Sequence, residues 1–322
     1  MARALIVGIE NYDKIPSLTG CVNDARAMRE VLESHEDSTP NFECRVLTSP
    51  GRHSITRKLL REELSKLFAN YDEDILFYFS GHGHPTEIGG YLVTQDAEAG
   101  EPGINMDELL TYANKSTARS VLLILDCCFA GGLGDPAALQ GRERIETKAL
   151  LRDGLTILAA SRPMQTAYEA DGSGVFTSLV VGALRGGAAD VRGRVSAAAI
   201  YAYVEQALGP FDQRPVYKSH AHMLEPVRRC QPAVPDSLLR ELPEIFKNPE
   251  EGFRLAPSYE YTRKSAKPEH VELFDKFKLL RNARLVTTEG DMDLYFAALK
   301  KKSVYLTPLG RYYWQLARSR RI

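Results

Sequence analysis

Two residues able to carry out covalent catalysis each follow a short apolar segment of the chain. His82 comes soon after the apolar run of residues 75–79, in the sequence Ser-Gly-His-Gly. Cys128 ends the sequence Asp-Cys-Cys, which directly follows the apolar run of residues 121–125. A cysteine thiol can attack a carbonyl carbon, and an imidazole can carry the proton that the thiol gives up. The pair predicts a hydrolase with Cys128 as nucleophile and His82 as base.

Strand geometry distinguishes between the two adjacent cysteines. Successive side chains of a strand point to opposite faces, so Asp126 and Cys128 share one face while Cys127 points to the other, which we expect to be buried. The glycine after His82 allows close backbone approach, and we expect the amides of Gly83 and Cys128 to hold a developing oxyanion. Taken singly, a cysteine or histidine is more often an ordinary buried or turn residue. Their combination favours catalysis.

The segments that must position these residues alternate between two patterns. Short strand patterns occur at residues 4–9, 42–47, 75–79, 121–125 and 155–159, most of them apolar. Helical patterns occur at residues 23–34, 54–70, 106–113, 174–185 and 195–208. Strands that are apolar throughout are typical of a parallel sheet between two layers of helices. We predict an α/β fold, a three-layer sandwich with a mostly parallel central sheet. Ligands of such folds bind beyond the carboxyl ends of the strands.

The chain has 322 residues, enough for one large and one small domain. The α/β pattern covers residues 1–230. Residues 231–268 contain six prolines, which predicts an extended linker. Residues 269–322 have helical patterns, and residues 265–322 carry twelve Lys and Arg against six Asp and Glu, so we expect a small, mainly α, basic domain at residues 269–322.

Composition excludes several classes of protein. Hydrophobic residues make up 44% of the chain, charged residues 26%, and the net charge is −1, as in ordinary globular proteins. The five cysteines are an odd number without the spacing of disulfides or zinc ligands, so we expect reduced thiols. No apolar run approaches the roughly 20 residues that cross a bilayer, and the N-terminus has no signal-peptide pattern. We expect a cytoplasmic protein without membrane attachment.

Three motifs resemble the metacaspases, a group of caspase-like cysteine peptidases. They are Ser-Gly-His-Gly at residues 80–83, Asp-Cys-Cys at residues 126–128 and Leu-Thr-Gly-Cys-Val-Asn-Asp-Ala at residues 18–25. The similarity extends over residues 1–230. It implies a caspase-like fold and a regulated cysteine endopeptidase of signalling, stress or defence, with His82 and Cys128 as catalytic dyad. It also implies protein substrates, a regulatory protein partner and no cofactor for the chemistry.

The resemblance further implies the pocket for the side chain that precedes the cleaved bond. The matching positions here are Cys21, Asp24, Ser80 and Asp126. Two carboxylates in such a pocket would favour Arg or Lys over acidic residues. The alternative for Asp24 is an acid at a helix N-terminus, stabilised by the helix dipole.

Some metacaspases bind calcium through carboxylates near the active site. Asp135 matches one family position by its distance from Cys128, and Asp96 and Asp107 are further candidate ligands. Carboxylate oxygens are the ligands that calcium prefers. An aspartate followed by proline, as at residue 135, is equally typical of a plain turn. Calcium is therefore a possible cofactor.

The stretch between residues 132 and 154 is rich in glycine and then basic. A loop of this length inside a compact domain is more often functional than structural. Its basic residues are of the kind that the expected pocket accepts. We therefore predict autoprocessing after Arg142, Arg144, Lys148 or Arg152.

The C-terminal domain contains Leu-Thr-Pro-Leu-Gly-Arg at residues 306–311, which resembles the wing and closing helix of winged-helix domains. Its basic charge makes nucleic-acid binding possible, while the modest size of that charge suits a protein-docking adaptor equally well. The alternative to an enzyme is an inactive regulator that binds nucleic acid or a protein partner through this domain. The presence of both His82 and Cys128 favours the enzyme.

Overall fold

The computed structural model describes residues 1–69, 71–86, 89–127, 151–160, 174–208, 215–221 and 225–322. The chain divides into two compact units. Unit 1 comprises Met1–Ala189 and Arg194–Cys230, and unit 2 comprises Asp190–Gly193 and Gln231–Ile322. None of the helices described here is long and apolar enough to cross a membrane.

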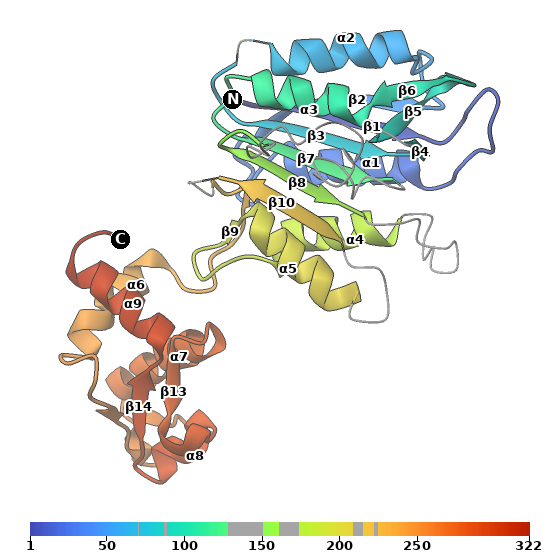
Figure 1. The fold of residues 1–322 in the computed structure, drawn as a ribbon. Helices are drawn as coiled ribbons and strands as arrows, with labels where there is room; N and C mark the ends of the chain where they lie inside the picture. The colour runs from blue at the N-terminus through green and yellow to red at the C-terminus, as the bar shows by residue number, and fades with distance from the viewer. Residues whose placement is uncertain (70, 87–88, 128–150, 161–173, 209–214, 222–224) are drawn as a thin grey trace. The chain divides into compact units, whose positions relative to one another are not determined.

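Within the described residues, unit 1 is built around a six-stranded sheet with the order β10-β8-β7-β3-β1-β2. The strands are β1 (Ala2–Ile9), β2 (Phe42–Ser49), β3 (Ile75–Ser80), β7 (Val121–Asp126), β8 (Leu155–Ala159) and β10 (Val216–His220). All neighbours pair in parallel except β10, which is antiparallel to β8 (Figure 1). The predicted, mostly parallel sheet is confirmed. Because β3 and β7 are adjacent, their carboxyl-terminal ends meet at one edge.

Helices cover both faces of this sheet, which makes three layers (Figure 1). One face, called here the α1 face, carries α1 (Cys21–Leu32), α4 (Val175–Gly182) and α5 (Ala197–Leu208). The opposite face, called the α2 face, carries α2 (Arg57–Phe68) and α3 (Met106–Lys115). The α/β sandwich predicted from the alternating patterns is thus confirmed.

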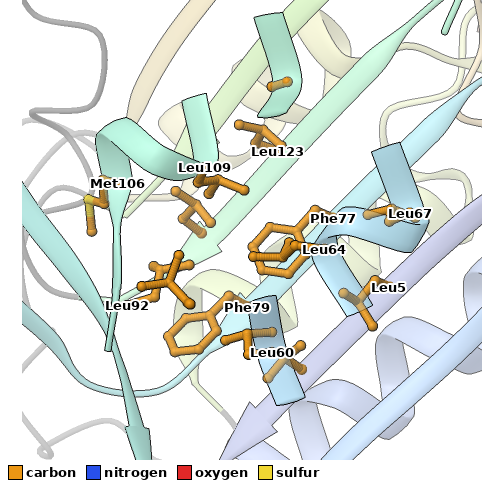
Figure 2. Packing of buried hydrophobic residues seen from close by; sticks show 14 of the residues in the cluster. Leu5, Leu60, Leu64, Leu67, Phe77, Phe79, Leu92, Met106, Leu109 and Leu123 are labelled. Atoms are coloured by element: carbon orange, nitrogen blue, oxygen red, sulfur yellow. The ribbon is translucent and has the colours of Figure 1, made fainter. Parts of the chain in front are cut away.

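Alternate strand residues supply the two hydrophobic layers. On the α2 face, Phe77 and Phe79 of β3 pack with Leu64 of α2 and Leu109 of α3 (Figure 2). Tyr78, between the two phenylalanines, belongs to the core of the α1 face. The strand period of two residues therefore places the polar residue that ends β3 on the α1 face as well.

A second, antiparallel sheet begins directly after His82. Its strands are β4 (Gly83–Thr86), β5 (Gly89–Glu98) and β6 (Glu101–Asn105), in the order β4-β5-β6. The sequence did not predict these strands, because they carry glycine, proline and charged residues that are commoner in loops. Leu92, Val93 and Ala97 of β5 join the core of the α2 face. Unit 1 also contains η4 (Ala183–Gly187) and the pair β9 (Arg194–Val195) and β11 (Arg228–Arg229).

Unit 2 has a mainly helical core around a small sheet with the order β12-β14-β13. Its elements are α6 (Asp236–Ile245), β12 (Phe253–Arg254), η5 (Pro257–Tyr259), α7 (Pro268–Asn282), β13 (Val286–Thr288), η6 (Glu289–Asp291), α8 (Leu294–Leu299), β14 (Ser303–Leu306) and α9 (Pro308–Arg318). Phe274 and Phe277 of α7 and Trp314 of α9 lie in its core.

Residues 231–268 differ from the extended linker that their prolines predicted. They form α6, β12 and η5, and Leu239, Leu242 and Phe246 are buried in the core of unit 2. Three of these prolines stand at helix starts, since Pro235 is the N-cap of α6, Pro257 begins η5 and Pro268 begins α7, whereas Pro243 lies inside α6. At the start of a helix, the missing N–H of proline has no bond to lose.

The stretch that resembles a winged-helix motif, residues 306–311, forms the end of β14 and the first turn of α9. Thr307 caps α9 by accepting a hydrogen bond from the amide of Gly310 at 3.1 Å. β13 and β14 pair in antiparallel fashion before this helix. Whether unit 2 binds nucleic acid or protein stays a prediction.

Candidate active site

The carboxyl-terminal ends of β3 and β7 bring together the residues predicted to do chemistry. Ser80, the last residue of β3, pairs with Asp126, the last residue of β7. His82 follows β3 by two residues and Cys127 follows β7 by one. Cys128 lies outside the described residues, as do Asp135, Arg142, Arg144 and Lys148.

The imidazole of His82 is held by the loop that follows β1. Its Nε2 lies 2.9 Å from the carbonyl oxygen of Pro16. Because a carbonyl oxygen only accepts hydrogen bonds, Nε2 carries the proton of this bond, and in the neutral ring Nδ1 holds the lone pair. The arrangement leaves Nδ1 as the atom that can take up a proton.

Tyr12 fixes the backbone of His82 from the same loop. The amide of His82 donates to the Tyr12 hydroxyl at 2.8 Å, and the two ring centroids lie 4.9 Å apart. Gly81 makes this contact possible, since a Cβ atom there would lie 2.8 Å from the Tyr12 hydroxyl oxygen. The carbonyl of His82 accepts from the amide of Val93 at 3.0 Å, so β5 also holds this residue.

The four residues of the expected pocket lie close together on the α1 face. Ser80 donates from Oγ to Oδ2 of Asp24 at 3.2 Å, and Ser80 is also hydrogen-bonded to the thiol of Cys21. Asp24, Ser80 and Cys21 are buried, with 2%, 2% and 6% of their surface exposed. We call Cys21, Asp24, Ser80 and Asp126 the acidic cluster.

Gly174, just before α4, lies next to both carboxylates of the acidic cluster. Its amide donates to Oδ1 of Asp24 at 3.0 Å. A Cβ atom on Gly174 would lie 3.1 Å from Oδ2 of Asp126 and 3.2 Å from Oδ2 of Asp24. The Oδ2 atoms of both carboxylates thus lie near the Cα of Gly174, and any side chain at this position would press on both of them.

Two hydroxyl groups support the Asp126 carboxylate. Thr177 of α4 donates from Oγ1 to Oδ2 of Asp126 at 2.6 Å. The Tyr78 hydroxyl lies 2.6 Å from the same Thr177 oxygen. Because the Thr177 proton goes to the carboxylate, Tyr78 donates to Thr177, and the chain of donors ends on Asp126.

Burial dominates the protonation of the acidic cluster. Burial and, after it, the neighbouring Asp126 carboxylate together raise the pKa of Asp24 to about 7, against the hydrogen bonds from Gly174 and Ser80. Burial also raises the pKa of Asp126, opposed by its hydrogen bonds with Thr177. The thiol of Cys21 has its pKa raised to about 12 by burial, so it stays protonated and is no nucleophile.

Cys127 lies on the side of the strand that the sequence predicted. It is 5% exposed and packs in the core of the α2 face, whereas Asp126 is part of the acidic cluster.

The expected oxyanion donor Gly83 begins β4, opposite Leu92. Arg152, the described member of the predicted processing residues, donates to the carbonyl oxygens of Ala113, Ala118 and Asp153.

The described candidates for calcium binding do not form a site. Asp96 accepts from the amide of Arg57 at 2.9 Å, at the start of α2, and from the Thr94 hydroxyl at 2.7 Å. Asp107 is exposed in the first turn of α3. In the part of the chain that the structure describes, no three His, Cys, Asp or Glu residues are grouped to hold a metal ion.

Sequence reasoning missed several residues that shape the site. Tyr12 and Pro16 precede the motif that begins at Leu18, and their roles depend on a backbone amide and a backbone carbonyl. For Gly174 and Thr177, the sequence predicts only a position at the start of a helix within the region of family resemblance. The signal for them is spatial, because both act on carboxylates far away in the sequence.

Comparison with known proteins bears on this arrangement. The Caspase domain family matches residues 1–224. Metacaspase-6 of Arabidopsis thaliana is 30% identical over 175 residues, which are 48% of this chain and 45% of that protein. Metacaspase-5 of Trypanosoma brucei brucei is 31% identical over 150 residues, 41% of this chain and 29% of that protein. The chain thus spans less than half the length of these curated relatives.

Among solved structures, caspase-1 from Spodoptera frugiperda is similar to this chain, with 16% sequence identity and a TM-score of 0.49. The alignment covers 71% of this chain and 90% of that structure.

Proposed function

The chain belongs to the Caspase domain family, and from this membership we propose that it is a cysteine endopeptidase that cleaves after Arg or Lys. The observation that carries the specificity is the pair of Oδ2 atoms, from Asp24 and Asp126, that lie near the Cα of Gly174. A guanidinium or ammonium group placed there would meet two carboxylates, while an acidic side chain would meet repulsion.

The burial of Asp24 strengthens this preference for a positively charged side chain. Asp24 is nearly fully buried, and a buried carboxylate gains more from an opposite charge than one in water. An arriving cation would favour the ionised form of Asp24, whose pKa burial has raised. The pocket without a substrate side chain is therefore poised for a positively charged one.

The proposed chemistry uses His82 and Cys128. The Cys128 thiol gives its proton to Nδ1 of His82, and the thiolate attacks the substrate carbonyl carbon to form a C–S bond. The C–N bond then breaks as His82 returns the proton to the leaving amine. Water, giving a proton to His82, attacks the thioester; the C–S bond breaks and Cys128 recovers its proton. The amides of Gly83 and Cys128 would hold the oxyanion.

The Pro16 carbonyl supports this role of His82. By accepting from Nε2, it fixes the ring orientation and stabilises the imidazolium that forms when Nδ1 is protonated. A backbone carbonyl thus takes the place that a carboxylate has in other catalytic arrangements.

A peptide library that varies the residue before the cut tests the proposal. Purified protein should cleave after Arg and Lys at least about a hundredfold faster than after Asp, a ratio of the size that charge recognition supplies. The assay is run with calcium and with a chelator, because Asp135, which matches a calcium-binding position of the family, lies outside the described residues and the prediction of calcium binding stays untested. Cys128→Ala should cleave nothing. A folded wild-type chain inactive in both conditions would overturn the proposal and favour the non-catalytic regulator.

A further inference from the structure

We propose that a cavity beside His82 binds an apolar side chain of the substrate, from one of the first two residues after the cleaved bond. The inference rests on the proposed peptidase function. The cavity has a volume of about 390 Å³ and is lined among others by Ile15, His84, Tyr91, Val93, Ala97 and Ala99. Volumes of this size are at the lower end of those of ligand pockets, about 300–1,000 Å³.

The cavity is made by the segments that hold the catalytic imidazole. Ile15 precedes Pro16, whose carbonyl accepts from Nε2 of His82. Val93 donates from its amide to the carbonyl of His82, and His84 follows His82 by two residues. His82 does not line the cavity itself, and a ligand there would contact the segments that hold His82 in place.

The cavity and the acidic cluster belong to opposite faces of the central sheet. Val93 and Ala97 are part of the core of the α2 face. Ser80 and Asp126 continue the alternation of Tyr78 and Ile124, which are part of the core of the α1 face. A substrate that fills both places must cross the edge of the sheet where His82 lies.

The direction of the substrate follows from the proton transfer. His82 delivers a proton to the leaving amine, so the amine half of the substrate must lie on the side of the imidazole. The acidic cluster receives the side chain before the cut. The cavity would then receive a side chain that follows the cleaved bond. The residue before the bond and a residue after it would thus be selected at two different places.

The lining selects for apolar chemistry. Ile15, Val93, Ala97 and Ala99 present aliphatic groups, and Tyr91 adds a ring. Lys14 and Glu98, the oppositely charged lining residues, pair with each other at 2.5 Å. A Leu, Met or Phe side chain is the expected occupant, because burying it removes apolar surface from water.

The test uses a competition among peptides that share Arg before the cut and vary in the next two residues. Wild-type protein should favour Leu, Met or Phe over Gly or Asp at one of these positions by about tenfold in kcat/KM, the effect of partial burial of such a side chain. Ala99→Trp, at an exposed turn residue, should fill the cavity and remove the preference. Ala202→Trp, at an exposed residue of α5, is the matched control and should keep it.

Wild-type protein is also assayed on a peptidyl-arginine methyl ester, which has no residue after the cleaved bond. Hydrolysis of the ester together with indifference to the following residues overturns the subsite and leaves the proposed function standing. An unchanged apolar preference in a folded Ala99→Trp protein overturns the subsite as well. Failure to hydrolyse both the ester and every peptide overturns the proposed function, and the subsite with it.

Discussion

Asp126 lies close enough to Asp24 to add to the effect of burial, and together they raise the pKa of Asp24 to about 7. The two carboxylates thus compete for ionisation as long as no cation lies between them. Binding of a cation and loss of the Asp24 proton should therefore be coupled.

The coupling predicts how affinity depends on pH. Binding of an arginine-containing peptide to Cys128→Ala protein should strengthen about tenfold between pH 6 and pH 8, because deprotonated Asp24 binds the cation. Calorimetric titration measures this. Asp24→Asn should bind more weakly and lose most of the pH dependence; a variant that retains the wild-type profile would place the titrating group elsewhere.

The same pKa predicts a dependence of stability on pH. A carboxylate whose pKa is raised on folding stabilises the fold in its protonated form, below about pH 4, and loses that contribution as the pH rises through about 7. Asp24→Asn should therefore raise Tm relative to wild type more at pH 8 than at pH 5. Glu62→Gln, at an exposed position of α2, should change Tm equally at both. An equal shift for Asp24→Asn would contradict the raised pKa.

Gly174 offers a test of the pocket without touching a charge. Gly174→Ala would place a Cβ atom 3.1 Å from Asp126 Oδ2, in the space proposed for the substrate cation. KM for Arg peptides should rise at least about tenfold, as expected when a binding space is filled. Gly182→Ala, at the last residue of α4, meets its nearest neighbour at 3.5 Å and should keep wild-type kinetics. Equal kinetics for both variants would move the pocket away from Gly174.

Cys127 and Cys128 should respond differently to substitution. Cys128→Ala and His82→Ala should abolish cleavage, because each removes a group that forms a bond or moves a proton. Cys127→Ala should keep most activity and lose about 1 kcal/mol of folding free energy, since it shortens a buried side chain in the core of the α2 face. Peptide cleavage and thermal melting measure the two effects. Full activity of Cys128→Ala would refute the assignment.

Much of unit 1 could be predicted from the sequence because four strands of its central sheet, β1, β3, β7 and β8, are mainly apolar, whereas the polar strand β10 was not predicted. The parallel sheet and the convergence of Ser80 and Asp126 follow from strand order and from a side-chain period of two residues. The antiparallel strands after His82 could not be predicted, since Pro85 and several glycines hide the pattern. The prolines of residues 231–268 predicted a linker where the structure has helices and a strand, because proline suits a helix start as well as a linker.

Arg152 limits the prediction of autoprocessing. Its guanidinium donates to three backbone carbonyls, so presenting it to a peptidase pocket would break these bonds. We expect self-cleavage after Arg142, Arg144 or Lys148 and not after Arg152. Mass spectrometry of active protein beside Cys128→Ala checks this. A cut after Arg152 alone would show that these bonds open readily, and an intact chain in active protein would show that no processing is needed.

The hydrogen bond between His82 and the Pro16 carbonyl has a consequence for evolution. Every amino acid has a main-chain carbonyl, so substitution at position 16 leaves the acceptor in place. What the site cannot tolerate is a change in the length of the loop between β1 and α1, which would move that oxygen away from the imidazole. Among relatives, we expect position 16 to vary in residue identity, while the loop as a whole resists insertion and deletion.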